Sequence, residues 1–221
     1  MKHLAIFLLL LTGSVYGQQT AGMANTHRGE IYFGVRTTGS LFSSSGNYFG
    51  VGAGWQVRYR LADKLGTEWF ADWITTDIGK AGHRYDAHIG ESMIIYFTNH
   101  IGKKNHFSPY ILGGFCGDYT KIQANLFFDD RQQAYVTTSK DRWSFATQLG
   151  FGTHFNITEK FDLSFSGQYV LHFGRDIDSR IETNSHGEKY LQIQDQPGSA
   201  LEGHFFFTLS ANFVIADLSK K

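Results

Sequence analysis

The chain has 221 residues, and its 20 Lys and Arg balance 20 Asp and Glu, so the formal net charge is zero. This balance argues against a nucleic-acid partner, which requires a basic surface. Proline occurs only 2 times, whereas glycine occurs 25 times and aromatic residues make up 16%. Scarce proline suits long paired strands, because proline cannot donate a hydrogen bond to the ladder.

The first residues have the pattern of a secretory signal peptide. Lys2 is followed by the apolar run Leu4–Leu11 and then by Val15-Tyr16-Gly17, with small residues where a signal peptidase reads. The apolar run is far shorter than the roughly 20 residues of a membrane-spanning helix. We therefore expect residues 1–17 to be cleaved off before Gln18. Because no cysteine follows the apolar run at the cleavage site, a lipid anchor is not expected. Residues 18–28 are expected to form a short periplasmic segment.

Strict alternation of apolar and polar residues then dominates, as expected for strands with two different faces. In Phe49–Leu61, odd positions are apolar or aromatic, whereas even positions are glycine followed by Gln56, Arg58 and Arg60. Several such runs approach a dozen residues, longer than the usual five or six and suited to a tilted membrane strand of about 9 to 11. Eight strands are predicted: Glu30–Thr38, Phe49–Leu61, Leu65–Ile74, Tyr85–Phe97, Phe107–Tyr119, Trp143–Phe155, Phe161–Phe173 and His204–Phe213.

Two strands leave a question about facing. Glu91 falls on the apolar face of its strand, where a carboxylate in lipid is costly, so a bulge, an interfacial position or a register error is expected. In Phe107–Tyr119 the glycines at 113, 114 and 117 leave the facing ambiguous. Cys116 in this strand is interpreted as a small strand residue without chemistry, because a lone cysteine cannot form an intramolecular disulfide.

The predicted connections alternate in length, as in bacterial outer-membrane barrels with short periplasmic turns and long outer loops. The short set is Ala62–Lys64, Thr98–His106 and Asn156–Lys160. The long set is Ser40–Tyr48, Thr75–Arg84, Lys121–Asp141 and Gly174–Leu201. Both termini are therefore expected on the periplasmic side. The prediction is an all-β, eight-stranded antiparallel up-and-down transmembrane β-barrel over residues 29–214, with a tail at 215–221.

A soluble periplasmic lipocalin-like binder is the alternative fold, with apolar residues inside. Long strands and a glycine-rich face that also carries the charges favour a narrow polar lumen in a membrane barrel. The mean hydropathy of −0.26 does not contradict this, since a membrane barrel hides half of each strand's side chains in its lumen.

The sequence resembles the outer-membrane β-barrel domain family of the PorT-like group, and its architecture is similar to OmpA-type and OmpX-type barrels. The residues that carry the resemblance are the signal peptide with its Gly-Gln-Gln exit, Phe107–Gly114 and the aromatic strand His204–Phe213. The resemblance implies an outer-membrane location and a non-enzymatic role, as an accessory to secretion or through the outer loops. Such barrels often end on an aromatic residue, whereas here Val214–Lys221 follow Phe213, as a tail or as more strand.

Two sets of lumen residues are candidates for function. His172, His204, His88 and Asp72 are predicted near the outer rim, where a His–carboxylate pair could act as a general base. A lipid A deacylase of the PagL type would have serine two residues after its histidine, where this chain has Phe206. An internal ion-pair network is expected because buried charges must be paired. Its predicted members are Arg36, Arg58, Arg60, Glu68, Asp72 and Asp162.

The predicted function is that of a monomeric, non-enzymatic outer-membrane barrel acting through its outer loops. Outer-membrane lipid and lipopolysaccharide are the expected surroundings, with a possible protein partner at the loops. No cofactor and no metal are expected. The enzymatic alternative is a lipid A-modifying protein with a site at the outer rim.

Overall fold

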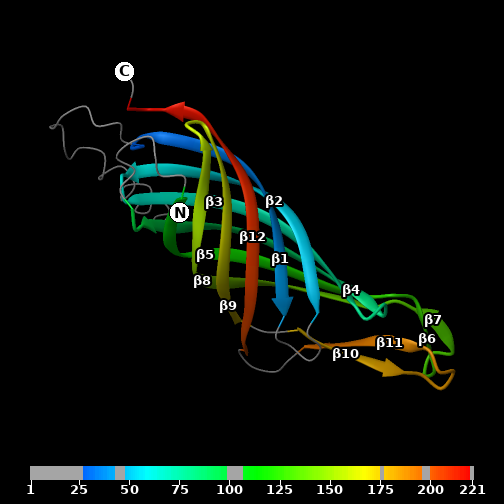
Figure 1. The fold of residues 1–221 in the computed structure, drawn as a ribbon. Helices are drawn as coiled ribbons and strands as arrows, with labels where there is room; N and C mark the ends of the chain where they lie inside the picture. The colour runs from blue at the N-terminus through cyan, green and yellow to red at the C-terminus, as the bar shows by residue number, and fades with distance from the viewer. Residues whose placement is uncertain (1–26, 43–47, 99–106, 175–176, 196–199, 220–221) are drawn as a thin grey trace.

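The computed structural model describes residues 27–42, 48–98, 107–174, 177–195 and 200–219. Within them, eight antiparallel strands close into a barrel in the order β1-β12-β9-β8-β5-β4-β3-β2 (Figure 1). The barrel strands are β1 (Glu30–Phe42), β2 (Phe49–Ala62), β3 (Leu65–Ile78), β4 (Gly82–Tyr96), β5 (Phe107–Ala124), β8 (Ser139–Thr158), β9 (Phe161–Gly174) and β12 (Ala200–Asp217). The predicted fold class is therefore confirmed.

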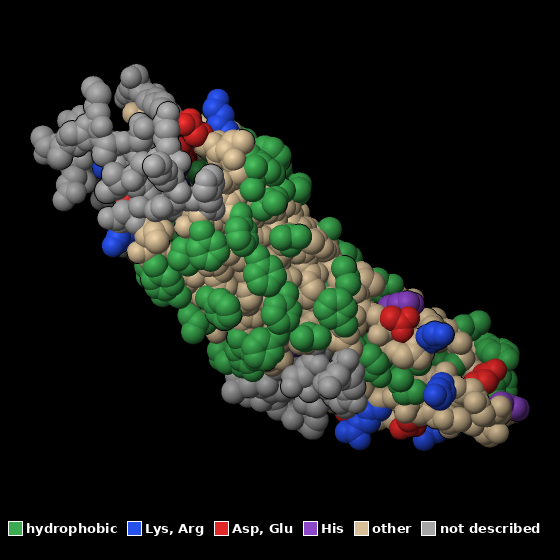
Figure 2. Space-filling view, in the orientation of Figure 1, with side chains coloured by type: hydrophobic (Ala, Val, Ile, Leu, Met, Phe, Trp, Pro, Cys, Tyr) green, Lys and Arg blue, Asp and Glu red, His purple; other side chains and the backbone are tan. Residues whose placement is uncertain are grey.

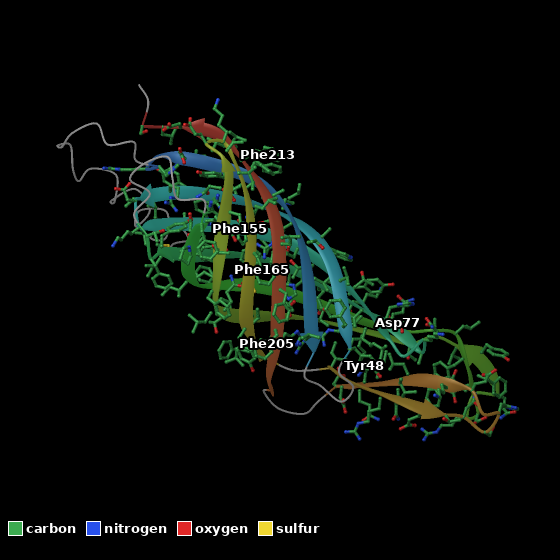
Figure 3. The ribbon with its side chains drawn as sticks, viewed as in Figure 1. Tyr48, Asp77, Phe155, Phe165, Phe205 and Phe213 are labelled. Carbon is green, nitrogen blue, oxygen red and sulfur yellow. The ribbon has the colours of Figure 1, made fainter. Side chains whose placement is uncertain are left out.

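The side chains face as a membrane barrel requires. Trp55 on β2 and Leu149 on β8 are 49% and 70% exposed, whereas Gln56 and Arg58 are each 2% exposed inside. Figure 2 shows apolar side chains covering the barrel wall, with charged side chains towards its two ends. Figure 3 shows the aromatic residues Phe213, Phe155, Phe165 and Phe205 along this wall. A lipocalin-like binder would have the opposite facing, so that alternative is wrong.

Most strands extend beyond their predicted ends on the side opposite the termini. The predicted loop Thr75–Arg84 is a tight turn, because β3 runs to Ile78 and β4 begins at Gly82. Gly79 and Lys80 make this turn with positive φ angles of 58° and 63°. Polar residues such as Thr76 and Arg84 still pair along the ladder. The alternation of apolar and polar residues weakens where the strands leave the membrane. The strands were therefore predicted to be too short on this side.

Two of the predicted long loops contain short hairpins. The connection between β5 and β8 contains β6 (Phe127–Asp129) and β7 (Ala134–Val136), and the connection between β9 and β12 contains β10 (Ile177–Thr183) and β11 (Lys189–Asp195). Both hairpins project beyond the barrel, at the end away from the chain termini (Figure 1). By the usual orientation of such barrels this end is extracellular.

At the other end, β12 continues through Val214 to Asp217, pairing with β1 as far as Glu30. The strand therefore extends into the predicted tail at 215–221. The predicted signal peptide at residues 1–17, residues 18–26 and most of the predicted turn Thr98–His106 lie outside the described residues. In the described part of the chain, no helix is long and apolar enough to cross a membrane.

The lumen is filled by side chains and is less uniformly polar than predicted. Phe70, Ile74, Cys116, Val170 and Phe206 form one buried apolar cluster with Ala146. Cys116 is a free, buried cysteine. Lumen glycines make room for large neighbours: a Cβ at Gly152 would lie 2.6 Å from the hydroxyl oxygen of Tyr110. Near the periplasmic end, a cavity of about 10 Å³ between Tyr32, Arg58 and Asp162 has space for about one water molecule.

Glu91 faces outward in an unbroken β3–β4 register opposite Trp69, so neither a bulge nor a register error explains it. Thr67 donates a hydrogen bond to the Glu91 carboxylate at 2.9 Å. The strand therefore presents a carboxylate between Ile89 and Met93 on its apolar face.

Candidate functional site

Arginine-centred ion pairs occupy one part of the lumen. On β1, Arg36 lies 3.4 Å from a Glu68 carboxylate oxygen and 3.0 Å from one of Asp72, both on β3. Its guanidinium also donates to the Thr208 hydroxyl at 3.3 Å and lies 4.9 Å from the Phe70 ring centroid. Gly54 permits this arrangement, since a Cβ there would lie 2.3 Å from an Asp72 oxygen.

A second arginine pair lies nearer the periplasmic end. Arg58 on β2 forms an ion pair with Asp162 on β9, across the lumen. The guanidinium of Arg58 lies 4.2 Å from the Tyr32 ring centroid. Asn212 donates to the other Asp162 oxygen at 2.8 Å. The carboxylate of Asp162 is thus compensated by a fixed cation and additional donors.

Arg60 is not part of these ion pairs. Its guanidinium lies 3.6 Å from the Tyr96 ring centroid and donates to the Asp63 carbonyl oxygen at 3.1 Å. Because Arg60 is close to the β2–β3 turn, a backbone carbonyl is within its reach. The turn and an aromatic face therefore hold this arginine, although its Nε has no hydrogen-bond partner among the described residues.

A different polar cluster lies towards the extracellular end, on β4, β5 and β9. The Asp118 carboxylate on β5 places Oδ1 3.0 Å from His88 Nε2 and Oδ2 2.9 Å from His172 Nδ1. Ser144 on β8 donates to Oδ2 at 3.0 Å. Asp118 is fully buried and both histidines are 1% exposed. We refer to His88, Asp118 and His172 as the His–Asp–His cluster.

Neighbouring side chains complete the surroundings of the cluster. The His204 ring centroid lies 4.7 Å from that of His172, and the Phe206 ring lies edge-on to His88 at 4.9 Å. On the other side, Thr120 donates to Asp86 at 2.7 Å, and the Arg84 guanidinium contacts both Asp86 oxygens at 3.0 Å. Arg84 is thus held by the carboxylate of Asp86.

The structure brings the rim candidates into one region of the lumen. His172 lies beside His204, and His88 meets His172 through Asp118. Asp72 lies opposite His88 in the β3–β4 register but forms its ion pair with Arg36. Sequence analysis missed Asp118 because the glycines of its strand obscured the facing. A usable signal was the alternation of Cys116, Asp118 and Thr120 with outward Phe115 and Tyr119.

The cluster lies inside the barrel, away from lipid. Each of its histidines and His204 is 1% exposed. The serine that contacts it, Ser144, donates to Asp118 and is not paired with an imidazole as a nucleophile would be. The geometry can neutralise or bind a small positive species.

Comparisons with known proteins agree with the fold. The family model for the outer membrane protein beta-barrel domain matches residues 5–188. The crystal structure of Neisserial surface protein A is similar with a TM-score of 0.54 and 13% identity, covering 84% of this chain and 97% of that one. A major outer membrane protein from Thermus thermophilus gives a TM-score of 0.52 and 13% identity, covering 83% and 98%. No curated protein sequence matches the chain.

The solved structures are too distant in sequence to show more than a shared fold. The family match covers most of the chain, and the outward apolar wall and inward polar side chains agree with it. The protein is therefore located in the outer membrane, and the chain belongs to the outer membrane protein beta-barrel domain family.

Proposed function

We propose that this barrel is non-enzymatic and presents its two extracellular hairpins as one preformed surface for a protein partner. The observation that carries the proposal is that the hairpins, from separate connections, pack together as a folded unit. We call this unit the extracellular extension: residues 125–138 and 177–195.

The extension shares a hydrophobic core with the barrel mouth. Ile177 and Leu191 of the second hairpin pack with Ile78, Ile122 and neighbouring residues at the barrel mouth. Phe127 of the first hairpin stacks on Tyr190 of the second, with ring centroids 4.6 Å apart. Burial of apolar residues beyond the membrane indicates a defined shape, whereas a solvated loop would have no such core.

Polar contacts also join the two hairpins. Asn184 donates to the Phe128 carbonyl at 3.0 Å. The Ser185 backbone donates to Asp130 at 2.9 Å, and its hydroxyl donates to the same carboxylate. The hydroxyl bond, followed by the backbone bond, lowers the pKa of Asp130 from its usual value. These contacts preorganise the surface, which reduces the entropy cost of binding.

The surface offers anchor residues of the kind found in protein interfaces. Tyr135 is 62% exposed and Leu126 is 68% exposed at the outer end. Ion pairs Lys140–Asp195 and Arg180–Asp178 lie around the second hairpin. Exposed aromatic residues surrounded by polar ones favour a protein partner over bulk lipid. A partner on another cell or in a secretion assembly would use this same surface.

Photo-crosslinking on intact cells tests the proposal. A photoreactive phenylalanine analogue at Tyr135 is expected to give a protein adduct of defined mass, and the same analogue at Phe165 on the lipid-facing wall serves as the matched control. The photoreactive analogue placed at Tyr190 should give an adduct with the same partner. Replacing residues 126–137 by a short Gly-Ser linker should abolish that adduct. Adducts with lipopolysaccharide alone, or none, would contradict the proposal. Lipid A of a deletion strain is expected to keep its mass, and a changed mass would favour the enzymatic alternative.

A further inference from the structure

Among the described residues, the negative charge of Asp118 is not paired with an arginine or a lysine. Its side chain is fully buried, and its ion-pair partners within the described residues are the imidazoles of His88 and His172. The arginine nearby, Arg84, contacts Asp86. Because an isolated buried carboxylate is costly, a positive species must accompany Asp118. Either an imidazole carries an additional proton or a cation binds.

The contact geometry favours a cation between these side chains. Although His88 Nε2 and His172 Nδ1 lie 3.0 and 2.9 Å from the Asp118 oxygens, neither nitrogen has hydrogen-bond geometry. The other ring nitrogens, His88 Nδ1 and His172 Nε2, are also buried without a hydrogen-bond partner among the described residues. Buried imidazoles are normally oriented by hydrogen bonds. Here two of them surround a carboxylate without such bonds.

The spacing is close to that of a metal site. One ligand atom from each of His88, Asp118 and His172 can be chosen so that all three lie within 4.8 Å of one another. Zinc bonds of 2.0–2.2 Å place tetrahedral ligand atoms about 3.3 Å apart. Small changes in side-chain torsion therefore suffice to bring the three donors to one ion.

We propose that the His–Asp–His cluster binds one divalent transition-metal ion of the zinc class inside the barrel. Two imidazoles and one carboxylate are a donor set that favours zinc over calcium or magnesium, which prefer all-oxygen ligands. Ser144 donates a hydrogen bond to the Asp118 carboxylate, as residues that orient the ligands of metal sites commonly do. The His204 ring lies beside His172, with the ring centroids 4.7 Å apart.

The ion would connect strands that do not pair directly. β5 and β9 are separated in the barrel by β8. Between them, Ala146 on β8 is small and fully buried, and it lies opposite Cys116 and His172 in the register. A bound ion would therefore fix the barrel wall beneath the extracellular extension. This role differs from the proposed binding function and does not depend on it.

Cobalt titration of the full folded chain tests the metal proposal. The protein is prepared without a histidine tag, folded in detergent, stripped with a chelator and titrated with Co²⁺, whose visible absorption reports nitrogen and oxygen ligands. We expect saturation at one Co²⁺ per chain, reversed by Zn²⁺ in competition. Nitrogen-15 NMR of labelled histidines should show two imidazoles shifting with Zn²⁺.

The variants His88→Gln, His172→Gln and Asp118→Asn should each weaken binding by more than about 100-fold, since loss of an outer partner alone costs 10–100-fold. Matched controls are His83→Gln, on the outer face of the same strand β4, and His186→Gln in the extension; both should bind as the unaltered protein does. Heat-modifiable gel mobility verifies that each variant has folded.

Two results would overturn the proposal. If the folded wild-type chain shows no saturable binding, a proton compensates Asp118. If binding persists in all three cluster variants, or is lost in His186→Gln, the ion occupies surface imidazoles. The wild-type titration decides the question even if one cluster variant fails to fold.

Discussion

Two groups of buried carboxylates in the same lumen have different compensating side chains. Asp162 and Asp72 each have an arginine, Arg58 or Arg36, as a fixed cation. Asp118, nearer the extracellular end, has two histidines. Arginine is always protonated, so the first group is neutralised by the chain itself. Histidine changes charge near neutral pH or binds metals, so the second group depends on what is supplied from solution.

The comparison separates structural from responsive polar groups within one lumen. The arginine ion pairs hold strands together under all conditions. The His–Asp–His cluster can be occupied or empty. Four carboxylates lie in four different surroundings: beside arginine, beside histidine, facing lipid and facing water.

The largest effect is expected for Asp162→Asn. It leaves Arg58, which is 2% exposed, without its carboxylate. Breaking a buried pair by removing one partner costs about 3–5 kcal/mol of unfolding free energy. Urea unfolding in lipid vesicles, followed by tryptophan fluorescence, measures this loss. The control Asp178→Asn removes the partner of the exposed Arg180 and should cost no more than about 1 kcal/mol. Equal losses in both variants would contradict the prediction.

A smaller effect is expected for Asp118→Asn measured with a chelator present. This substitution removes a buried charge and leaves two imidazoles that can be neutral, together with unmade hydrogen bonds from Ser144 and Thr120. Lost hydrogen bonds of this kind cost about 1–3 kcal/mol. The same vesicle assay should therefore place Asp118→Asn below Asp162→Asn, and Zn²⁺ should stabilise the wild type alone. A loss as large as that of Asp162→Asn would indicate a fixed cation beside Asp118.

Glu91→Leu is expected to stabilise the barrel. The carboxylate faces the apolar wall and is compensated by one hydrogen bond from Thr67. Charged side chains on the lipid face of a barrel cost up to about 2–4 kcal/mol at the midplane, with acidic ones costing less. We expect a gain of about 1–2 kcal/mol in the vesicle assay. Ser92→Ala, the neighbouring lumen position, is the control and should not stabilise. A loss of stability in Glu91→Leu would contradict the prediction and would show that the hydrogen bond from Thr67 outweighs the cost of the charge.

The smallest effect concerns pH and the exposed Asp130. Ser185 lowers the pKa of this carboxyl, so its contribution is fully present above about pH 4, the ordinary carboxyl value. The contribution is lost as the pH falls through the lowered pKa, because protonation removes the acceptor. Corrected for its intrinsic pH dependence, hydrogen exchange at the Ser185 amide should therefore be less protected below about pH 4 in the wild type. In Asp130→Asn it should be faster already at neutral pH, and unchanged exchange would show that the two hairpins are held by apolar packing alone.

Much of the barrel follows from residues near one another in the chain. Alternation in Phe49–Leu61 predicts which side chains face lipid, because a strand has a period of two whatever its neighbours are. The number of strands, the polar lumen and the outer-membrane location follow in the same way. The extracellular extension was predicted only as long loops, because its strands are short and have weak alternation, as in Phe127–Asp129.

Contacts inside the lumen could not be predicted to this degree. The sequence places His172 and His204 at one height, since they lie on neighbouring strands, and the structure agrees. It does not place Asp118 between His88 and His172, because β5 and β9 are not hydrogen-bonded to each other. Their meeting depends on the register of β8, on the small side chain of Ala146 and on closure of the barrel. The sequence alone determined which residues face inward, whereas only the closed tertiary structure decided which of them meet, because those contacts cross the lumen between strands that share no ladder.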